Sequence, residues 1–318
     1  MASVKRIKTA ATGSNNDTGF GSNASAYGGR FVNKDGSFNV RIDGTSFRQR
    51  FSIYHSMLNM PRWKFALAIV LFFVLINMLF TAVYVLYGAN YFQGFVAKTE
   101  WGKIKELYFF STETFTTVGY GRLNPIGDGV NLVASFEAML GFLSFAIATG
   151  LIYGRFSKPR AYLVFSHHAV IGPFQDKTGL MFRVAPYKNG HILTDVQIRV
   201  TMAMQIEEDG KLTAKFYTLT LERNRVDSLM MNWTVVHPLD ESSPLYGYTA
   251  EDMKNADVEI YVLMRGFDEV YANMVQQRTS YTFDEIVHDA KFLPMYHESE
   301  DGRTTIFELN KLNHYKQL

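Results

Sequence analysis

The chain of 318 residues is long enough for one large domain or two ordinary ones, and 47% of its residues are apolar. Its formal net charge of +2 gives no general reason to expect nucleic-acid binding. The sequence contains no cysteine, which excludes disulfides, thiolate metal sites and a cysteine nucleophile.

Two long apolar segments interrupt the chain. Residues 65–89 carry no charge, and residues 129–153 carry only Glu137. About 20 such residues cross the hydrocarbon core of a bilayer as a helix, so spans are predicted at residues 63–89 and 129–156. The chain is therefore predicted to be a protein of the cell (inner) membrane. Under the positive-inside rule, the basic residues next to the spans place both of its ends in the cytoplasm. These residues are Arg62, Lys64, Arg155, Lys158 and Arg160.

The segment between the spans has an unusual pattern. Residues 102–116 have a helical pattern but are too short to cross a bilayer, so they are predicted to be a re-entrant pore helix. The next stretch, TVGYG at residues 117–121, has glycines at alternate positions, which suit neither a buried helix nor an ordinary strand. Extended backbone at membrane depth is tolerated only where it lines a water-filled path. The stretch is therefore predicted to line a pore.

This stretch has the chemistry of a potassium filter. Four chains that turn the carbonyls of Thr117, Val118, Gly119 and Tyr120 inward, with the Thr117 hydroxyl below, would replace the hydration shell of K⁺. Gly119 and Gly121 permit the alternating dihedral angles that aim successive carbonyls at one axis. Since each chain supplies one filter strand, a homotetramer is predicted. The competing interpretation is a glycine-containing extracellular turn, but the order of span, short helix, motif and span favours the filter.

The texture of the chain changes after the second span. Residues 159–318 contain short runs rich in β-forming residues, broken by Gly, Asp and Asn, and this pattern predicts an antiparallel β-sandwich. No phosphate-binding glycine motif is found, so a standard nucleotide-binding fold is not expected. At the other end of the chain, residues 1–46 are predicted to be a disordered or extended cytoplasmic segment.

Several stretches, taken together with the filter, resemble the bacterial inward rectifier potassium channels. YHSMLNMPRWKF resembles the interfacial slide helix of this family, which is placed at residues 47–60. RFSKPRAYLVFSHHAV, HPLDESSPLYG and RTSYTFDEIVHDAKF resemble its linker and parts of its cytoplasmic domain. The resemblance implies a pore domain over residues 61–158 and an immunoglobulin-like sandwich over residues 159–318. It further implies passive potassium conduction, gated by anionic lipid and by movement of the cytoplasmic domain, with no catalysis and no cofactor beyond K⁺ ions.

The resemblance also implies a pair of charges that supports the filter. Family members hold a carboxylate behind the filter, here Glu113, and pair it with an arginine that follows the filter. Arg122 is the candidate partner, although it falls one residue earlier than in the eukaryotic members. A buried charge without a partner is costly, so some partner for Glu113 is expected.

One face of the second span is predicted to line the pore. Glu137, Gly141, Phe145, Ile152 and Tyr153 follow helical spacing down this face, and rings of Phe145 and Tyr153 could close the pore by dewetting. The alternative for these rings is ordinary packing between helices. Glu137 either faces the pore as a functional acid or makes a structural hydrogen bond to the pore helix. Eukaryotic strong rectifiers carry an acid at the position of Phe145, so only weak block by polyamine or Mg²⁺ is expected.

Residues at the cytoplasmic ends of the spans match family positions that contact anionic lipid. Each basic residue near such a surface contributes roughly 1 kcal/mol. The alternative is that they only anchor the topology. The residues are Arg62, Trp63, Lys64, Arg155, Lys158 and Arg160. A different class of function also stays open, in which the chain is a membrane-tethered sandwich that senses or binds a partner and its pore does not conduct.

Overall fold

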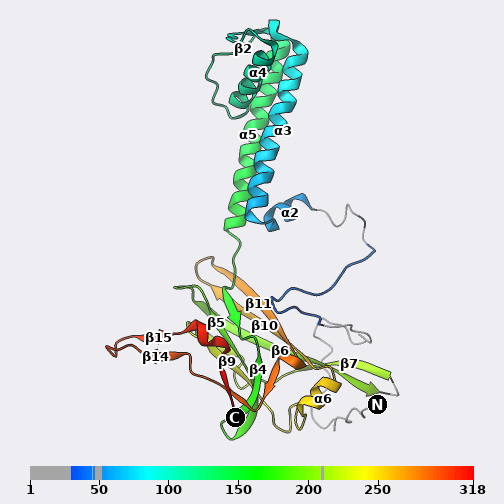
Figure 1. The fold of residues 1–318 in the computed structure, drawn as a ribbon, viewed down its shortest axis with the longest axis vertical. Helices are drawn as coiled ribbons and strands as arrows, with labels where there is room; N and C mark the ends of the chain where they lie inside the picture. The colour runs from blue at the N-terminus through cyan, green and yellow to red at the C-terminus, as the bar shows by residue number, and fades with distance from the viewer. Residues whose placement is uncertain (1–29, 45, 47–51, 209–210) are drawn as a thin grey trace. The chain divides into compact units, whose positions relative to one another are not determined.

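The computed structural model describes residues 30–44, 46, 52–208 and 211–318. The chain divides into two compact units, one of residues 43–158 and one formed by residues up to 42 together with 159–318. Each unit is described by itself. Figure 1 shows the helical unit with α2, α3, α4 and α5, and the β-rich unit that carries the strands from β3 onward.

Two helices in the first unit are long and apolar enough to cross a membrane, α3 (Arg62–Tyr87) and α5 (Asp128–Phe156). A short helix, α2 (Ile53–Asn59), precedes them and begins at Ser52, whose side chain accepts a hydrogen bond from the backbone of His55. The predicted slide helix therefore corresponds to α2, and residues 47–51 of its predicted range lie outside the described residues.

The segment between α3 and α5 folds back on itself. The turn η1 (Ala89–Tyr91) and strand β1 (Phe92–Gln93) lead to helix α4 (Glu100–Phe115), and strand β2 (Asn124–Pro125) pairs antiparallel with β1. α4 begins at Thr99, whose side chain caps the backbone amide of Gly102. With only 16 residues, α4 is about 24 Å long, which is shorter than the hydrocarbon core.

α4 is held against both long helices by an aromatic core. The ring of Tyr84 on α3 lies 5.5 Å from Phe92 and 5.3 Å from Phe110, both edge to face. Leu107, Leu123 and Val130 complete the cluster. These contacts fix the position from which the chain enters and leaves residues 117–121.

The second unit is a sandwich of two five-stranded sheets, which confirms the predicted fold class. The first sheet has the order β11-β10-β6-β7, with β8 also paired to β6, and the second has the order β12-β4-β5-β3, with β9 also paired to β5. The pairings within these sheets are antiparallel except for β12 with β4, which are parallel. The bounds are β3 (Leu163–Phe165), β4 (Ala169–Phe174), β5 (Lys177–Pro186), β6 (Leu193–Glu208), β7 (Lys211–Thr218), β8 (Arg225–Leu229), β9 (Trp233–Pro238), β10 (Glu259–Asp268), β11 (Asn273–Thr282) and β12 (Ile286–His288).

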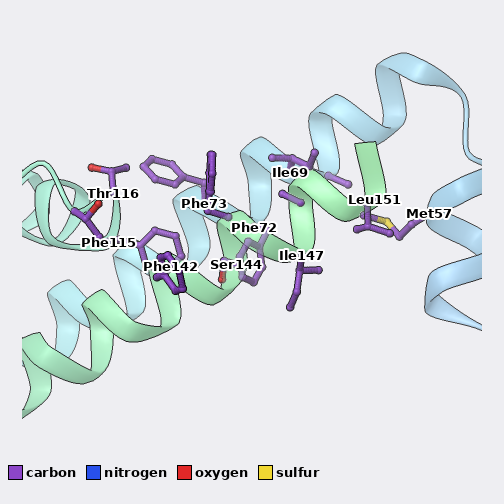
Figure 2. Close-up of a pocket in the computed structure, with 15 residues that line it drawn as sticks. Met57, Ile69, Phe72, Phe73, Phe115, Thr116, Phe142, Ser144, Ile147 and Leu151 are labelled. Atoms are coloured by element: carbon purple, nitrogen blue, oxygen red, sulfur yellow. The ribbon is translucent and has the colours of Figure 1, made fainter. Parts of the chain in front are cut away.

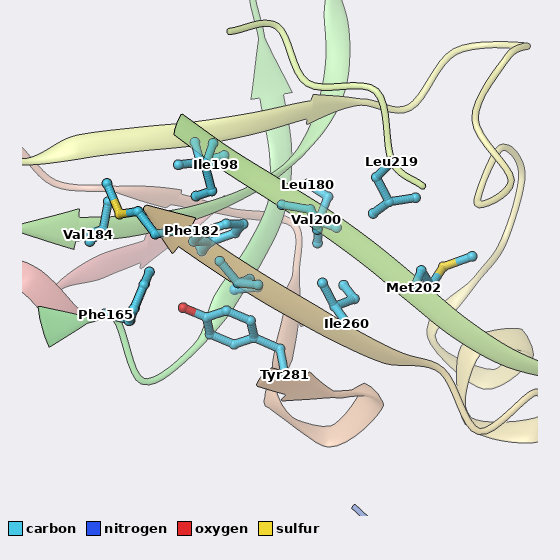
Figure 3. Packing of buried hydrophobic residues seen from close by; sticks show 14 of the residues in the cluster. Phe165, Leu180, Phe182, Val184, Ile198, Val200, Met202, Leu219, Ile260 and Tyr281 are labelled. Atoms are coloured by element: carbon cyan, nitrogen blue, oxygen red, sulfur yellow. The ribbon is translucent and has the colours of Figure 1, made fainter. Parts of the chain in front are cut away.

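Alternating residues of the strands form the core between the two sheets. On β6, Ile198, Val200 and Met202 are buried and face it, as period-two alternation requires. Figure 3 shows these side chains together with Phe182 and Tyr281, whose rings lie 5.3 Å apart. The Tyr281 hydroxyl donates to the carbonyl of Ser166 at 3.0 Å, so the one polar group that this ring brings into the core is satisfied.

Smaller elements cover the sandwich. Two further two-stranded sheets pair β13 (Ala290–Phe292) with β16 (Tyr315–Gln317) and β14 (Tyr296–Glu298) with β15 (Thr305–Phe307). The other small elements are helix α6 (Ala250–Asn255) between β9 and β10, the turn η2 (Phe283–Glu285) between β11 and β12, and the turn η3 (Leu309–Asn313) between β15 and β16. The outer face of β5 packs on this C-terminal segment, since Ala185 lies in a buried cluster with Met295 and Leu312.

Part of the N-terminal segment that was predicted to be disordered or extended is held on the sandwich by specific contacts, and residues 1–29 of that predicted segment lie outside the described residues. Arg30 makes a two-pronged ion pair with Glu285, with nitrogen–oxygen distances of 3.0 and 2.8 Å. Val32 is buried beside Tyr261 and bridges to Phe38. Residues 30–42 therefore belong to the β-rich unit. Glu285 and Tyr261 lie more than two hundred positions away from their partners, where a local reading of the sequence could not find them.

Candidate ion-conduction site

The filter motif leaves the end of α4 with an unusual backbone. Thr117, Gly119 and Gly121 all have positive φ angles, of 59°, 54° and 79°, so left-handed residues alternate with ordinary ones. Such an alternation turns successive carbonyls toward one side, whereas an ordinary strand turns them to opposite sides. The amides of Val118 and Gly119 both donate to the carbonyl of Glu113, at 2.9 and 3.2 Å. The start of the motif is thereby tied to the last turn of α4.

The predicted pairing of Glu113 with Arg122 is wrong in this chain. The Arg122 guanidinium donates to Glu106 at 3.2 Å, and Glu113 supports the motif through its backbone carbonyl. The reason is directional: the chain runs back along α4 after the filter motif, so the residue that follows the motif meets an earlier turn of the helix. Glu106 lies seven residues before Glu113, which is two turns earlier on the same face.

Glu137 does not line a pore in the way the first of its two predicted roles required. It is fully buried, with its carboxylate accepting a hydrogen bond from the Tyr84 hydroxyl at 2.5 Å and another from the Ser111 hydroxyl. The amide oxygen of Asn77 lies 2.9 Å from the same Ser111 hydroxyl. The cluster joins α3, α4 and α5, which is the structural hydrogen bond to the pore helix that the sequence left as the alternative. Burial of an intramembrane acid is tolerated here because both of its oxygens have a donor.

Gly141 serves close packing between α5 and α4. A Cβ at this position would lie 1.9 Å from the carbonyl oxygen of Phe115, so only glycine allows the two backbones to approach this closely. This position is buried, in contrast to the exposed rings that follow along α5.

A cavity of about 700 Å³ lies below the filter motif. Figure 2 shows Thr116 at one end of it, with Phe142 and Ile147 along α5 and Phe72 on α3. Phe145 also lines the cavity and is 74% exposed in the single chain. The wall of this cavity is almost entirely apolar. Further along α5, Ile152 and Tyr153 are 41% and 72% exposed.

The basic residues at the helix ends do different things. Arg155 donates to the carbonyls of Met57 and Met60 at 2.5 and 2.7 Å, and its guanidinium lies 4.4 Å from the ring centroid of Phe65. It therefore satisfies carbonyls at the end of α2, as a cation at a helix C-terminus does. Lys158 donates to the side chain of Asn59 at 2.7 Å.

The remaining predicted lipid-binding residues are exposed. Arg62, Trp63 and Lys64 form the first turn of α3, and the Lys64 ammonium lies 5.4 Å from the ring centroid of Trp63. Arg160 lies in the β-rich unit, just after the division of the chain at Lys158.

Two family models match consecutive parts of the chain. Residues 69–158 match an ion channel model, and residues 163–317 match the C-terminal domain of inward rectifier potassium channels. Inward rectifier potassium channel Kirbac3.1 of Paramagnetospirillum magnetotacticum is 34% identical over 290 residues, which cover 91% of this chain and 96% of that protein. The chain belongs to the inward rectifier potassium channel family. It is a membrane ion channel and not an enzyme.

The match extends to human members of the family. Inward rectifier potassium channel 18 of Homo sapiens is 27% identical and ATP-sensitive inward rectifier potassium channel 12 of Homo sapiens is 26% identical. Each alignment covers 86% of this channel and 67% of the human protein. The matched region includes both the helical unit and the sandwich.

Sequence reasoning missed Glu106 and the partners of Glu137. Asn77 and Tyr84 each place a polar group inside an otherwise apolar segment, and that rarity is a usable signal. Ser111 begins the polar run STET of the pore helix and gives no such signal. The signal for Glu106 is weaker, because an acid in the first half of a helix also fits a solvated face or a favourable interaction with the helix dipole.

Proposed function

We propose that this channel is a homotetramer that conducts K⁺ selectively and passively through a filter formed by residues Thr117 to Gly121. The observation that carries the proposal is the alternation of positive φ angles at Thr117, Gly119 and Gly121 directly after a short re-entrant helix. Each chain supplies one filter strand, so closing the filter around an ion takes four copies.

The physical mechanism is replacement of the hydration shell. Carbonyls of Thr117, Val118, Gly119 and Tyr120, with the Thr117 hydroxyl at the inner end, take the place of water around a dehydrated K⁺ ion. The C-terminal end of α4 directs the negative end of its dipole toward the cavity below, which favours a cation there. The proposed function needs no cofactor other than K⁺ ions, which are the transported ions themselves.

The gate of the proposed pore lies along α5. Phe145 and Tyr153 are large apolar side chains exposed in the single chain, as side chains that line a shared path have to be. Rings of them would close the path by dewetting, and Ile152 adjoins the lower ring. Because Phe145 is apolar, polyamines and Mg²⁺ block the open pore only weakly.

Anionic lipid and the cytoplasmic unit supply the regulation. Both chain ends lie on the cytoplasmic side of the inner membrane, so the exposed basic side chains contact the anionic cytoplasmic leaflet. Arg62, Lys64, Lys158 and Arg160 bind headgroups, with Trp63 at the interface, while Arg155 holds α2 in place beside them. Movement of the cytoplasmic unit is transmitted to α5 through the chain that joins them.

Flux into liposomes tests the proposal. Wild-type protein is expected to take up rubidium in a barium-sensitive manner and to elute as a tetramer in detergent. Gly119→Ala adds a Cβ to a residue with φ of 54°, at a cost of about 1–3 kcal/mol per subunit, and is expected to abolish selective flux.

A matched control separates the filter from general strain. Gly302 lies in a surface turn of the sandwich with φ of 66°, and a Cβ there meets nothing within 4 Å, as at Gly119. Gly302→Ala is expected to leave flux and selectivity unchanged. The proposal is overturned if wild type shows no flux in several lipid mixtures. It is also overturned if the ratio of K⁺ to Na⁺ flux is the same in Gly119→Ala as in wild type.

A further inference from the structure

The side chain of Glu106 binds two segments that are far apart along the chain. Its two oxygens accept hydrogen bonds from the backbone amides of Val96 and Ala97, both at 3.1 Å, and from the guanidinium of Arg122 at 3.2 Å. Val96 and Ala97 precede α4, and Arg122 directly follows the filter. One carboxylate on the pore helix therefore joins the approach to the helix with the exit from the filter.

The backbone around this carboxylate is closely packed. A Cβ on Gly94 would lie 1.8 Å from the carbonyl oxygen of Arg122, so the two segments cross at contact distance. The Asn124 side chain donates to the carbonyl of Gly121 at 2.9 Å, and Gln93 pairs with Asn124 between β1 and β2. The exit of the filter is thus held on one side by backbone and on the other by Glu106.

The charges of the pair are unequally exposed. The side chain of Glu106 is 12% exposed and that of Arg122 is 50% exposed. A carboxylate can satisfy three donors, whereas a glutamine would present its own N–H₂ to two amides and a guanidinium. A neutral residue at position 106 would also leave the charge of Arg122 uncompensated beside the filter exit. With four subunits, that charge is repeated four times around the mouth.

We propose that Glu106 is a positioning residue for the outer end of the filter, acting through Arg122 and the segment of Val96 and Ala97. This inference rests on the proposed function, since the filter is the object being positioned. Glu106 contacts no ion. It holds the residue that follows Gly121 and cancels the positive charge at the mouth through which K⁺ passes.

The test compares Glu106→Gln, Arg122→Gln and the double variant with wild type in liposome flux. Glu106→Gln is expected to reduce the K⁺ to Na⁺ flux ratio by about tenfold or more, the loss typical of a hydrogen bond to a charged group. Its remaining K⁺ flux is expected to rise with ionic strength, because salt screens the uncompensated Arg122. The double variant is expected to recover this salt dependence to wild-type behaviour, which a purely structural role would not produce.

Glu100→Gln is the matched control. Glu100 lies in the first turn of the same helix, is 83% exposed and pairs with Lys103, so its loss is expected to change neither selectivity nor salt dependence. If Glu106→Gln behaves like Glu100→Gln while wild type conducts selectively, the positioning role is refuted and the channel function stands.

Hydrogen exchange gives a readout that does not depend on flux. Residues 118–124 and 94–98 are expected to exchange faster in Glu106→Gln tetramers than in wild type, while the sandwich stays protected to the same degree. Unchanged exchange in both segments refutes the inference even if no variant conducts. Should Glu106→Gln fail to assemble, the same measurement on Arg122→Gln decides, because that variant removes only the exposed partner.

Discussion

Removing the hydroxyl of Tyr84 separates the two roles that the sequence allowed for Glu137. Tyr84→Phe deletes one of the two donors to the Glu137 carboxylate and keeps the ring that packs on Phe92 and Phe110 at 5.5 and 5.3 Å. If Glu137 joins the three helices, the proposed tetramer loses stability. If Glu137 instead faced the conduction path, the main effect would be on cation block.

The magnitude follows from the burial of the pair. Tyr84 and Glu137 are both fully buried, so no water replaces the lost donor. Leaving a buried hydrogen-bonding group without its partner costs about 1–3 kcal/mol, and in the proposed tetramer the loss would be repeated in every subunit. Tyr87→Phe, at a position that is 40% exposed on the same helix, is expected to cost about 0.5 kcal/mol or less.

The assay is thermal dissociation of the proposed tetramer in detergent, followed by gel filtration, together with block of flux by spermine. Tyr84→Phe and Glu137→Gln are expected to lower the dissociation temperature clearly more than Tyr87→Phe, and to leave the spermine dose response unchanged. A Glu137→Gln channel with wild-type stability and altered spermine block would refute the burial argument and return Glu137 to the pore wall.

Three further outcomes are expected. Phe145→Asp places an acid in the apolar cavity and is expected to strengthen voltage-dependent spermine block by at least about tenfold in planar bilayers; a conducting variant without stronger block would remove Phe145 from the pore wall. Joint neutralisation of Lys158 and Arg160 is expected to change the flux response to phosphoinositide without changing selectivity, and a wild-type dose response would make them topology anchors only. Burial alone would raise the pKa of Glu285, but the Arg30 hydrogen bond and nearby charge outweigh it and hold the pKa below its usual value. The pair therefore contributes about 1 kcal/mol above the ordinary glutamate pKa of about 4.3, and this is lost as pH falls through the lower folded pKa. Arg30→Gln is expected to speed hydrogen exchange at residues 31–33 near about pH 7, and much less under acid; an equal effect at both pH values would contradict the linkage.

Much of the fold could be predicted because local patterns in the sequence indicate it. The spans are runs without charge, the sandwich is period-two alternation with turn residues, and the filter is a short motif whose glycines adopt the left-handed backbone that the motif demands. Each of these signals is contained within a window of a few tens of residues. Even so, the parallel pairing of β12 with β4 was missed, since it joins residues that local alternation cannot connect.

Side-chain pairing could not be predicted in the same way. The sequence offered Arg122 more than one acid on α4, and the direction in which the chain leaves the filter motif selects Glu106 over Glu113. The acid that pairs with Arg30 is distant along the chain, and this ion pair with Glu285 exists only because β11 and η2 bring that residue beside the N-terminal segment. The positions of two residues along the chain do not by themselves predict such long-range contacts.

The contacts found only in the structure converge on one element. α4 receives the filter exit through Glu106, the two long helices through Ser111, and the start of the filter through the carbonyl of Glu113. Because these attachments lie at successive levels of a helix of 16 residues, we expect a shift of α5 at Glu137 to be transmitted to the helix that leads into the proposed filter. A polar group inside an apolar segment needs a partner, and here each partner lies on a different element. The same requirement that makes these residues costly therefore links α3 and α5 to the helix that leads into the proposed filter.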